Sequence, residues 1–238
     1  MSEELLRVEH ISKRFGGVSA LVDLSFTIGK GEVLGIIGPN GAGKTTLFNC
    51  VTGILKPDAG KIIFLGQDVT KLPAHKVAKL GISRTFQIPR VMLDMTVLEN
   101  AIPAASLRHH EMNEIISSAQ KALSFVGLES RENKLAGTLN VSGKRMLEMA
   151  RALATEPKLL LIDEAAAGLT ESEVLDFNEK VRQITRSGIT VAIIDHVMKA
   201  ILPITSALIV LDHGVKIAQG SPDEVVKDEK VIEAYLGT

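Results

Sequence analysis

The sequence predicts an α/β fold with a mainly parallel sheet, a small antiparallel β subdomain and an inserted α-helical subdomain. Three observations predict it. A glycine-rich turn joins an apolar run at residues 33–37 to a helical segment that begins at residue 45. From residue 142 to residue 194 apolar strands alternate with helices, the order that produces a parallel sheet with right-handed crossovers. Short strands around tight turns precede this core, and residues 87–138 have a helical texture.

Strands and tight turns dominate the first part of the chain. The run at 33–37 is rich in β-branched residues, as is typical of a buried parallel strand. The expected strands are residues 5–11, 24–28, 33–37, 61–65 and 82–86. The expected turns, each marked by glycine, are residues 13–17, 29–31 and 56–60. Helices are expected at residues 45–51 and 74–80.

The later part is predicted to be helical at first and then to alternate with strands. Residues 112–126 carry apolar side chains at helical spacing, which indicates an amphipathic helix. The expected helices are residues 97–105, 112–126, 142–155, 171–187 and 222–236. The expected strands are residues 159–162 and 190–194 and a hairpin of residues 207–211 and 215–219. We therefore expect one domain, in which residues 1–86 and 139–238 form the core with its antiparallel β subdomain and residues 87–138 form the helical subdomain.

Composition limits the classes of function. Apolar residues make up 45% of the 238 residues and the net charge is -1, which argues for a globular protein without a basic nucleic-acid surface. The single Cys50 cannot form an internal disulfide and suits a reducing compartment. The acidic N-terminus lacks an apolar signal core, so export is not expected. The most apolar long stretch, residues 200–211, is too short to span a membrane. A role at a membrane would therefore require a partner.

One stretch matches the phosphate-binding pattern G-x-x-x-x-G-K-[ST] without a mismatch. It consists of Gly38, Pro39, Asn40, Gly41, Ala42, Gly43, Lys44, Thr45 and Thr46. Between a strand and a helix, such a P-loop turns its N–H groups onto phosphate oxygens. The Lys44 ammonium would reach the β- and γ-phosphates, and the Thr45 hydroxyl would ligate Mg²⁺. The alternative is a chance glycine-rich turn, against which the strand-loop-helix context argues.

Acidic and polar side chains follow other predicted strands. Asp163 and Glu164 end an apolar strand, where Asp163 would hold Mg²⁺ through water and Glu164 would polarise the attacking water. A solvated acidic turn is the alternative for an isolated pair of this kind. His196 follows another apolar strand and could hydrogen-bond the γ-phosphate, although a lone histidine is more often structural. Gln87, after the strand at 82–86, could contact Mg²⁺ or the water.

The order of these motifs resembles the ATP-binding subunit of ABC transporters, with its RecA-like core. The resemblance covers nearly the whole chain. Four pieces are similar to the subunits that serve branched-chain amino-acid importers: Phe15-Gly16-Gly17, Arg84-Thr85-Phe86-Gln87, Ala166-Ala167-Gly168-Leu169 and Ala234-Tyr235-Leu236-Gly237. The resemblance implies that Phe15 stacks on adenine and that residues 167–170 touch an opposite subunit.

Two positions depart from the family pattern. Where the family has the signature L-S-G-G-Q, this chain has Leu139-Asn140-Val141-Ser142-Gly143. Without a gap Asn140 replaces the serine, whereas with a slip of one or two residues Ser142 and Gly143 would supply the hydroxyl and the amide. An asparagine can still donate to phosphate, so all three are predicted nucleotide contacts. Ala165 stands where the family usually has proline, and this difference removes a rigid turn but no catalytic group.

The resemblance further implies two ATP molecules held between head-to-tail subunits, so that hydrolysis reopens the pair. The implied partners are a second ATP-binding subunit, identical or similar, transmembrane permease subunits and, indirectly, a substrate-binding protein. The implied location is cytoplasmic, on the inner face of the cell membrane and without direct insertion into it. Nucleic acid is not an expected partner. Residues 88–97 are predicted to receive a permease helix, with packing inside the helical subdomain as the alternative.

Other functions remain open from sequence. A weakly hydrolysing ATP-dependent scaffold would suit the altered signature, and an ABC system with another cargo would share every motif. An ABC ATPase acting on DNA or ribosomes usually has two cassettes or long insertions, and the insert here is short. A GTPase typically needs an Asn-Lys-x-Asp segment, which the sequence lacks.

Overall fold

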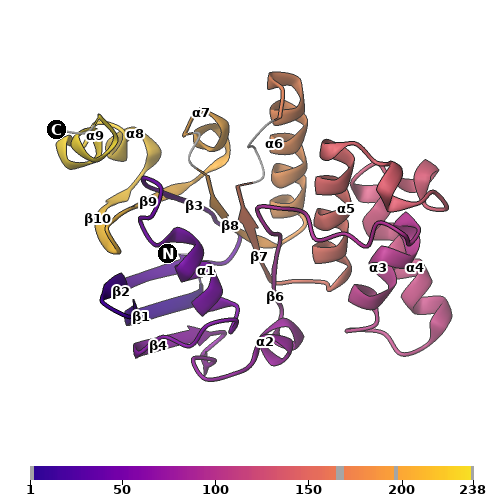
Figure 1. Cartoon of the computed structure of the whole chain (residues 1–238), viewed down its shortest axis with the longest axis horizontal. Coiled ribbons are helices and arrows are strands. Elements are labelled where there is room, and N and C mark those ends of the chain that lie inside the picture. Colours follow the sequence, from indigo (N-terminus) through magenta and orange to yellow (C-terminus); the bar gives the residue numbers. More distant parts are fainter. Residues whose placement is uncertain (1–2, 165–168, 196–197, 237–238) are drawn as a thin grey trace.

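The chain folds around two β-sheets (Figure 1). The computed structural model describes residues 3–164, 169–195 and 198–236. The smaller sheet is antiparallel in the order β2-β1-β4-β5, and the larger is mostly parallel in the order β10-β9-β3-β8-β7-β6. Both sheets, and helices between and beside them, confirm the predicted α/β class.

The antiparallel sheet is longer than its sequence pattern indicates. Its strands are β1 (Glu4–Phe15), β2 (Val18–Gly29), β4 (Ala59–Phe64) and β5 (Gln67–Asp68). The turn predicted at residues 13–17 is wrong in extent, because β1 continues to Phe15 and pairs Phe15 with Val18. Only Gly16 and Gly17 make the turn, where Gly16 has a positive φ of 55° that glycine adopts without strain.

In the larger sheet, the strands that pair in parallel all have their carboxyl ends at the same edge. Its strands are β3 (Val33–Ile37), β6 (Ile82–Arg84), β7 (Leu159–Asp163), β8 (Thr190–Ile194), β9 (Ala207–Asp212) and β10 (Val215–Gly220). The predicted strand 82–86 is two residues too long, since β6 ends at Arg84. Because β3 and β7 each pair in parallel with β8, the carboxyl ends of these three strands lie side by side.

Alternate residues of the central strands enter two hydrophobic clusters. Leu160 and Ile162 of β7 belong to one cluster, together with residues of the later helices, while Leu159 and Leu161 belong to the other. The second cluster includes Phe48 of α1 (Lys44–Val51) and residues of the antiparallel sheet. Burial on both faces explains why these strands are continuously apolar. The antiparallel sheet thus shares a core with the parallel sheet.

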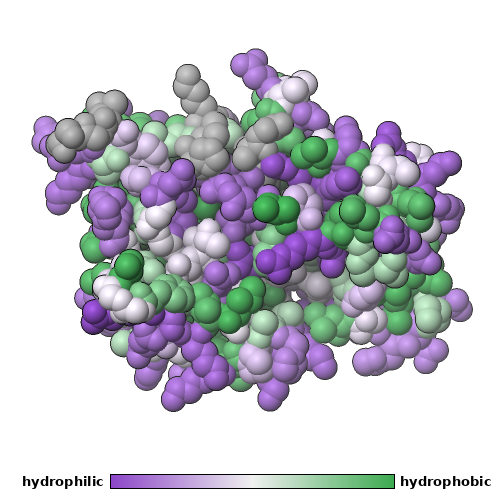
Figure 2. Space-filling model, in the orientation of Figure 1, coloured by the Kyte–Doolittle hydropathy of each residue, from purple (hydrophilic) through white to green (hydrophobic). Residues whose placement is uncertain are grey.

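The helical part consists of three packed helices. These are α3 (Val97–Ala105), α4 (Met112–Phe125) and α5 (Val141–Ala154), with short 3-10 turns at Glu129–Arg131 and Ala136–Thr138. Thr96 and Glu99 form a capping box that fixes the start of α3. In Figure 1 the three helices lie at the far side of the sheet from β1 and β2, and Figure 2 shows apolar and polar side chains interspersed over them.

The remaining helices surround the parallel sheet. They are α2 (Ala74–Leu80), α6 (Glu171–Arg186), α7 (Met198–Ile201), which leads into a 3-10 turn at Leu202–Ile204, α8 (Pro222–Val225) and α9 (Glu229–Leu236). None of the helices in the described ranges has the length and apolar content that crossing a membrane requires.

The single helix predicted at residues 222–236 is wrong. The chain forms two helices, because each has its own start signal. Ser221 and Glu224 form a capping box for α8. Asp228 then accepts a hydrogen bond from the Lys230 N–H at 2.9 Å and so caps the start of α9. Asp228, which lies inside the charged pattern predicted as one helix, therefore marks the boundary between two helices.

Candidate functional site

Glycines shape the loop between β3 and α1. Gly43 precedes α1 with a φ of 98°, and a Cβ there would lie 2.3 Å from the Ala20 carbonyl oxygen. A Cβ at Gly38 would lie 2.0 Å from the Leu211 carbonyl oxygen. Only glycine fits either position. No side chain caps the start of α1, and its first N–H groups lack partners within the helix, so this end is suited to bind an anion.

A cleft of about 270 Å³ lies over this loop. It is lined by Ala20, Asn40, Gly41, Ala42, Gly43, Lys44, Thr45, Thr46, Gln87 and Glu164. The fold therefore brings most of the predicted P-loop together with two predicted polar residues from distant parts of the sequence. Gly38 and Pro39 do not line the cleft, and their carbonyl groups instead bind Lys44.

Lys44 is buried, with 5% of its surface exposed. Its Nζ donates to the carbonyl oxygens of Gly38 at 2.7 Å and Pro39 at 2.8 Å. Burial lowers the pKa of Lys44, while the charges of Glu164 and Asp163 act in the opposite direction. A phosphate oxygen is a stronger acceptor for an ammonium group than a neutral carbonyl, so the side chain is suited to bind a nucleotide phosphate.

Asp163 lies behind the cleft lining at the end of β7, with 2% of its surface exposed. Its Oδ2 accepts a hydrogen bond from Arg84 Nη2 at 2.7 Å. Its Oδ1 is buried and has no hydrogen-bond partner among the residues that the structure describes. Burial raises the pKa of Asp163, and the Arg84 charge opposes that shift. A buried carboxylate oxygen without a partner is costly unless it serves a ligand or a metal-bound water.

These residues fit Mg²⁺. Among the described residues, no group of three His, Cys, Asp or Glu side chains forms a ready metal cage. Mg²⁺ does not need one, because it is usually held by one or two carboxylates, several waters and substrate phosphates. Thr45 in the cleft and the unpaired Oδ1 of Asp163 provide oxygen ligands of the required kind.

Glu164 and Gln87 meet in the cleft. Gln87 Nε2 donates to Glu164 Oε2 at 2.5 Å, and the Glu164 N–H donates to the Ile194 carbonyl oxygen at 2.8 Å. Glu164 has a positive φ of 47°, a strained conformation for a residue other than glycine. Such strain is frequent at functional sites. The loop after β7 is thus tied to β8 by its backbone and to residue 87 by its side chain.

The start of α5 does not line this cleft. Asn140 Oδ1 accepts a hydrogen bond from the Gly143 N–H at 2.8 Å, so Asn140 is the N-cap of α5. Neither Asn140, Ser142 nor Gly143 lines the cleft. Asn140 therefore occupies the position just before the helix, with Ser142 and Gly143 inside its first turn.

The other predicted site residues either do not line the cleft or lie outside the described residues. Phe15 is 47% exposed at the end of β1, and Lys13 Nζ lies 5.7 Å from its ring centroid. Phe15 does not line the cleft. His196 and residues 165–168 lie outside the described residues, so the predicted roles of His196 and Ala167 stay predictions.

Sequence reasoning missed two charged residues near the site. Arg84 is 5% exposed and bonds Asp163, and Asp195, after β8, is fully buried. The sequence did indicate that both residues need partners. Arg84 lies within a predicted core strand and Asp195 directly follows another, and a charge at such a buried position requires a partner.

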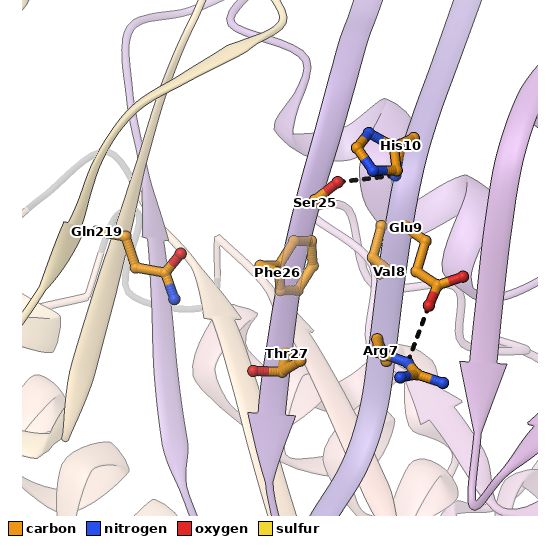
Figure 3. Close-up of a pocket in the computed structure, with 8 residues that line it drawn as sticks. All are labelled: Arg7, Val8, Glu9, His10, Ser25, Phe26, Thr27 and Gln219. Carbon is orange, nitrogen blue, oxygen red and sulfur yellow. Dashed lines mark hydrogen bonds and ion pairs between the residues drawn. The ribbon is translucent and has the colours of Figure 1, made fainter.

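A larger hollow lies elsewhere. It has a volume of about 560 Å³ and is lined by Arg7, Val8, Glu9, His10, Ser25, Phe26, Thr27 and Gln219. Figure 3 shows that its polar groups pair with one another, His10 N–H with Ser25 Oγ and Arg7 with Glu9. These residues come from β1, β2 and β10, and none belongs to the P-loop cleft. Size therefore does not decide which cavity carries the chemistry.

Fold and cleft together define a P-loop ATPase: a phosphate-binding loop, a carboxylate pair after a buried strand and a glutamine at one edge of a parallel sheet. The chain belongs to the ABC transporter family, whose model matches residues 21–167. A second model, branched-chain amino acid ATP-binding cassette transporter, matches residues 215–238.

Curated relatives and solved structures agree with this assignment. The chain is 36% identical to the high-affinity branched-chain amino acid transport ATP-binding protein BraF of Pseudomonas aeruginosa, over 100% of this chain and 99% of that protein. It is 34% identical to LivG of Escherichia coli, a protein of the same description, with the same coverage. It is similar to the ADP conformation of an ATP-binding cassette of an ABC transporter, with a TM-score of 0.91, 35% identity and full coverage of both chains. The chain is thus an ABC ATPase subunit homologous to these transport proteins.

Proposed function

We propose that this chain hydrolyses ATP with Mg²⁺ in the P-loop cleft and thereby powers the import of branched-chain or related amino acids. The observation that carries the proposal is the convergence of Lys44, Gln87 and Glu164 in one cleft, with the unpaired Oδ1 of Asp163 behind it. The cargo class rests on the relatives, which are branched-chain amino acid transport proteins, and on the match at residues 215–238.

Each residue has a distinct part in the proposed reaction. The N–H groups at the start of α1 and the Lys44 ammonium bind the β- and γ-phosphates and stabilise the charge that develops on them. Thr45 and Asp163 would hold Mg²⁺, which would neutralise negative charge on the phosphates. Glu164 accepts a proton from, or orients, the attacking water, and Gln87 positions that carboxylate through its amide. His196 is proposed to contact the γ-phosphate.

A second subunit is proposed to complete the site. The start of α5 lies outside the cleft of its own chain, and Val141 in its first turn is 63% exposed. An exposed helix N-terminus, with Asn140 and Ser142 near it, favours binding of a phosphate from another subunit. Head-to-tail pairing would place this helix over the partner's nucleotide, with Phe15 against the adenine.

The proposed permease contact is the segment of residues 88–97. Ile88 is 79% exposed and Leu93 is 50% exposed, which supports a docking role. Val91 instead packs against the helical core, so part of the segment supports the internal packing considered as the alternative from sequence. The proposed location is therefore the inner face of the cell membrane, through permease subunits that are served by a substrate-binding protein.

Purified protein tests the proposed reaction. Release of phosphate from ATP should require Mg²⁺ and should be lost in Glu164→Gln. Single-turnover hydrolysis, measured with and without the permease, separates a transport ATPase from a weakly hydrolysing scaffold, because the scaffold would bind ATP but release no phosphate in either case. Uptake assays with leucine, isoleucine and valine in a reconstituted transporter test the cargo.

A further inference from the structure

Arg84 is a cation with a buried side chain that bonds Asp163 beside the P-loop cleft. It ends β6, which pairs in parallel with β7, and its side chain is 5% exposed. All three guanidinium nitrogens donate hydrogen bonds: Nη2 to Asp163 Oδ2 at 2.7 Å, Nη1 to Asn49 Oδ1 at 2.5 Å and Nε to the Thr85 carbonyl oxygen at 3.3 Å. A guanidinium group that is this fully bonded has a fixed position and orientation.

Aromatic rings also hold the guanidinium group. Arg84 Cζ lies 4.8 Å from the centroid of the Phe86 ring and 5.8 Å from that of Phe48. Phe48 and Asn49 belong to α1, the helix that begins at the P-loop, whereas Phe86 precedes Gln87. Arg84 therefore contacts three elements of the site at once: the helix that carries Thr45, the strand that carries Asp163, and the segment that leads to Gln87.

The contact with Asp163 separates the two oxygens of the carboxylate. Oδ2 is occupied by Arg84, while Oδ1 is buried and no group in residues 3–164, 169–195 or 198–236 forms a hydrogen bond with it. A carboxylate fixed through one oxygen presents the other in one orientation, as partners of metal ligands generally do. Without the guanidinium group, the buried carboxylate would lose the contact that fixes its orientation and the cation that most strongly compensates its charge.

We propose that Arg84 is a positioning residue for the metal: it fixes Asp163 through Oδ2 so that Oδ1 serves the Mg²⁺ bound with ATP. This inference rests on the proposed function, because it assumes a Mg²⁺–ATP site at the cleft. Arg84 does not line the cleft, and its guanidinium nitrogens are bonded to Asp163, Asn49 and Thr85, so we do not assign it as a nucleotide ligand. Its effect is therefore on the part of nucleotide affinity that depends on Mg²⁺.

Equilibrium binding tests the proposal without relying on turnover. The dissociation constant of a fluorescent, non-hydrolysable ATP analogue is measured in excess Mg²⁺ and in EDTA, and the ratio of the two constants gives the contribution of Mg²⁺. Loss of a residue that orients a metal ligand typically lowers metal affinity about 10–100-fold. In Arg84→Met the Mg²⁺ contribution should fall by about that factor, while the affinity in EDTA stays within about twofold of wild type.

Control variants separate positioning from a general structural role. Arg108→Met makes the same substitution at an arginine that bonds the carbonyl oxygens of Thr155 and Lys79 rather than Asp163, so its Mg²⁺ contribution should equal that of wild type. Arg84→Lys keeps a charge but loses the planar fork, and it should give an intermediate loss. In the background of Asp163→Asn, Arg84→Met should have no further effect, because the two residues act through one contact.

The possible results are distinct. If Arg84→Met does not fold, as judged by its melting curve, Arg84→Lys provides the test, with a severalfold loss expected. An unchanged Mg²⁺ contribution in a folded Arg84 variant would overturn the inference. An increased contribution would also overturn it, since it would mean that Arg84 competes with the metal for Asp163. Wild-type protein with no Mg²⁺ contribution would instead refute the metal site on which the inference rests.

Discussion

Gln87 Nε2 donates a hydrogen bond to Glu164 Oε2 over 2.5 Å, so an amide from the segment after β6 holds a carboxylate from the loop after β7. Gln87 also lies at the junction between the core and the segment proposed to meet the permease. A displacement of that segment would therefore act directly on the carboxylate that we propose as the base.

Replacing this carboxylate tests its role. Glu164→Gln retains the size of the side chain and can still hydrogen-bond Gln87, but it cannot accept a proton. We expect ATP hydrolysis to fall by about 10²–10⁴-fold, the usual contribution of a general base, with ATP affinity retained. Gel filtration with Mg²⁺–ATP should show a trapped dimer. Unchanged phosphate release would contradict the role of Glu164.

Lys44→Ala removes the cation from the loop. Among the described residues that line the cleft, Lys44 is the one that carries a positive charge, the sign suited to phosphate. We expect calorimetry to detect no nucleotide binding even at about millimolar nucleotide concentration, because charge-assisted hydrogen bonds to phosphate are the strong ones. A melting temperature near that of wild type is the control for folding. Wild-type affinity in this variant would show that nucleotides bind elsewhere.

Asn140 is expected to have two separable roles. Asn140→Ala removes the cap of α5 and should lower the free energy of unfolding by about 0.5–2 kcal/mol. Asn140→Ser keeps an oxygen that can cap α5 and introduces the usual serine of the family signature, so the stability of this variant should match that of wild type. We expect ATPase activity at saturating protein concentration to fall in the alanine variant and to be retained in the serine variant. Equal activity of all three proteins would remove Asn140 from the nucleotide site.

Charged substitutions on the exposed part of residues 88–97 test the permease surface. Ile88→Asp and Leu93→Asp place charges on side chains that are 79% and 50% exposed, so folding and nucleotide binding should be unchanged. Transport by the assembled complex should be lost, because a charge would then be buried in the contact. Val91→Asp is a contrasting variant that should unfold the helical part. Normal transport by the first two variants would place the contact elsewhere.

Local patterns in the sequence predict most of the fold and much of the site. The P-loop and the apolar strand before Asp163 are continuous segments, and parallel pairing places their ends at one edge, so their meeting with Glu164 could be expected. The class of protein follows from the same motifs and is confirmed by the family match.

Features that depend on side-chain contacts between distant segments could not be predicted. The sequence does not indicate that Arg84 bonds Asp163, or that Gln87 bonds Glu164, because the segments are far apart and the choice of partner is made by packing. Boundaries were missed for a similar reason. Pairing with β2 extends β1 through a predicted turn, and a cap at Asp228 divides a predicted helix.

The structure of Glu164→Gln crystallised with Mg²⁺ and ATP would test the central claim most directly. We predict phosphates on the N–H groups of residues 41–46, the Lys44 ammonium on the β- and γ-phosphates, and Mg²⁺ beside Thr45 with Asp163 Oδ1 reaching it through water. A nucleotide bound outside this cleft, or a metal far from Asp163, would contradict the account.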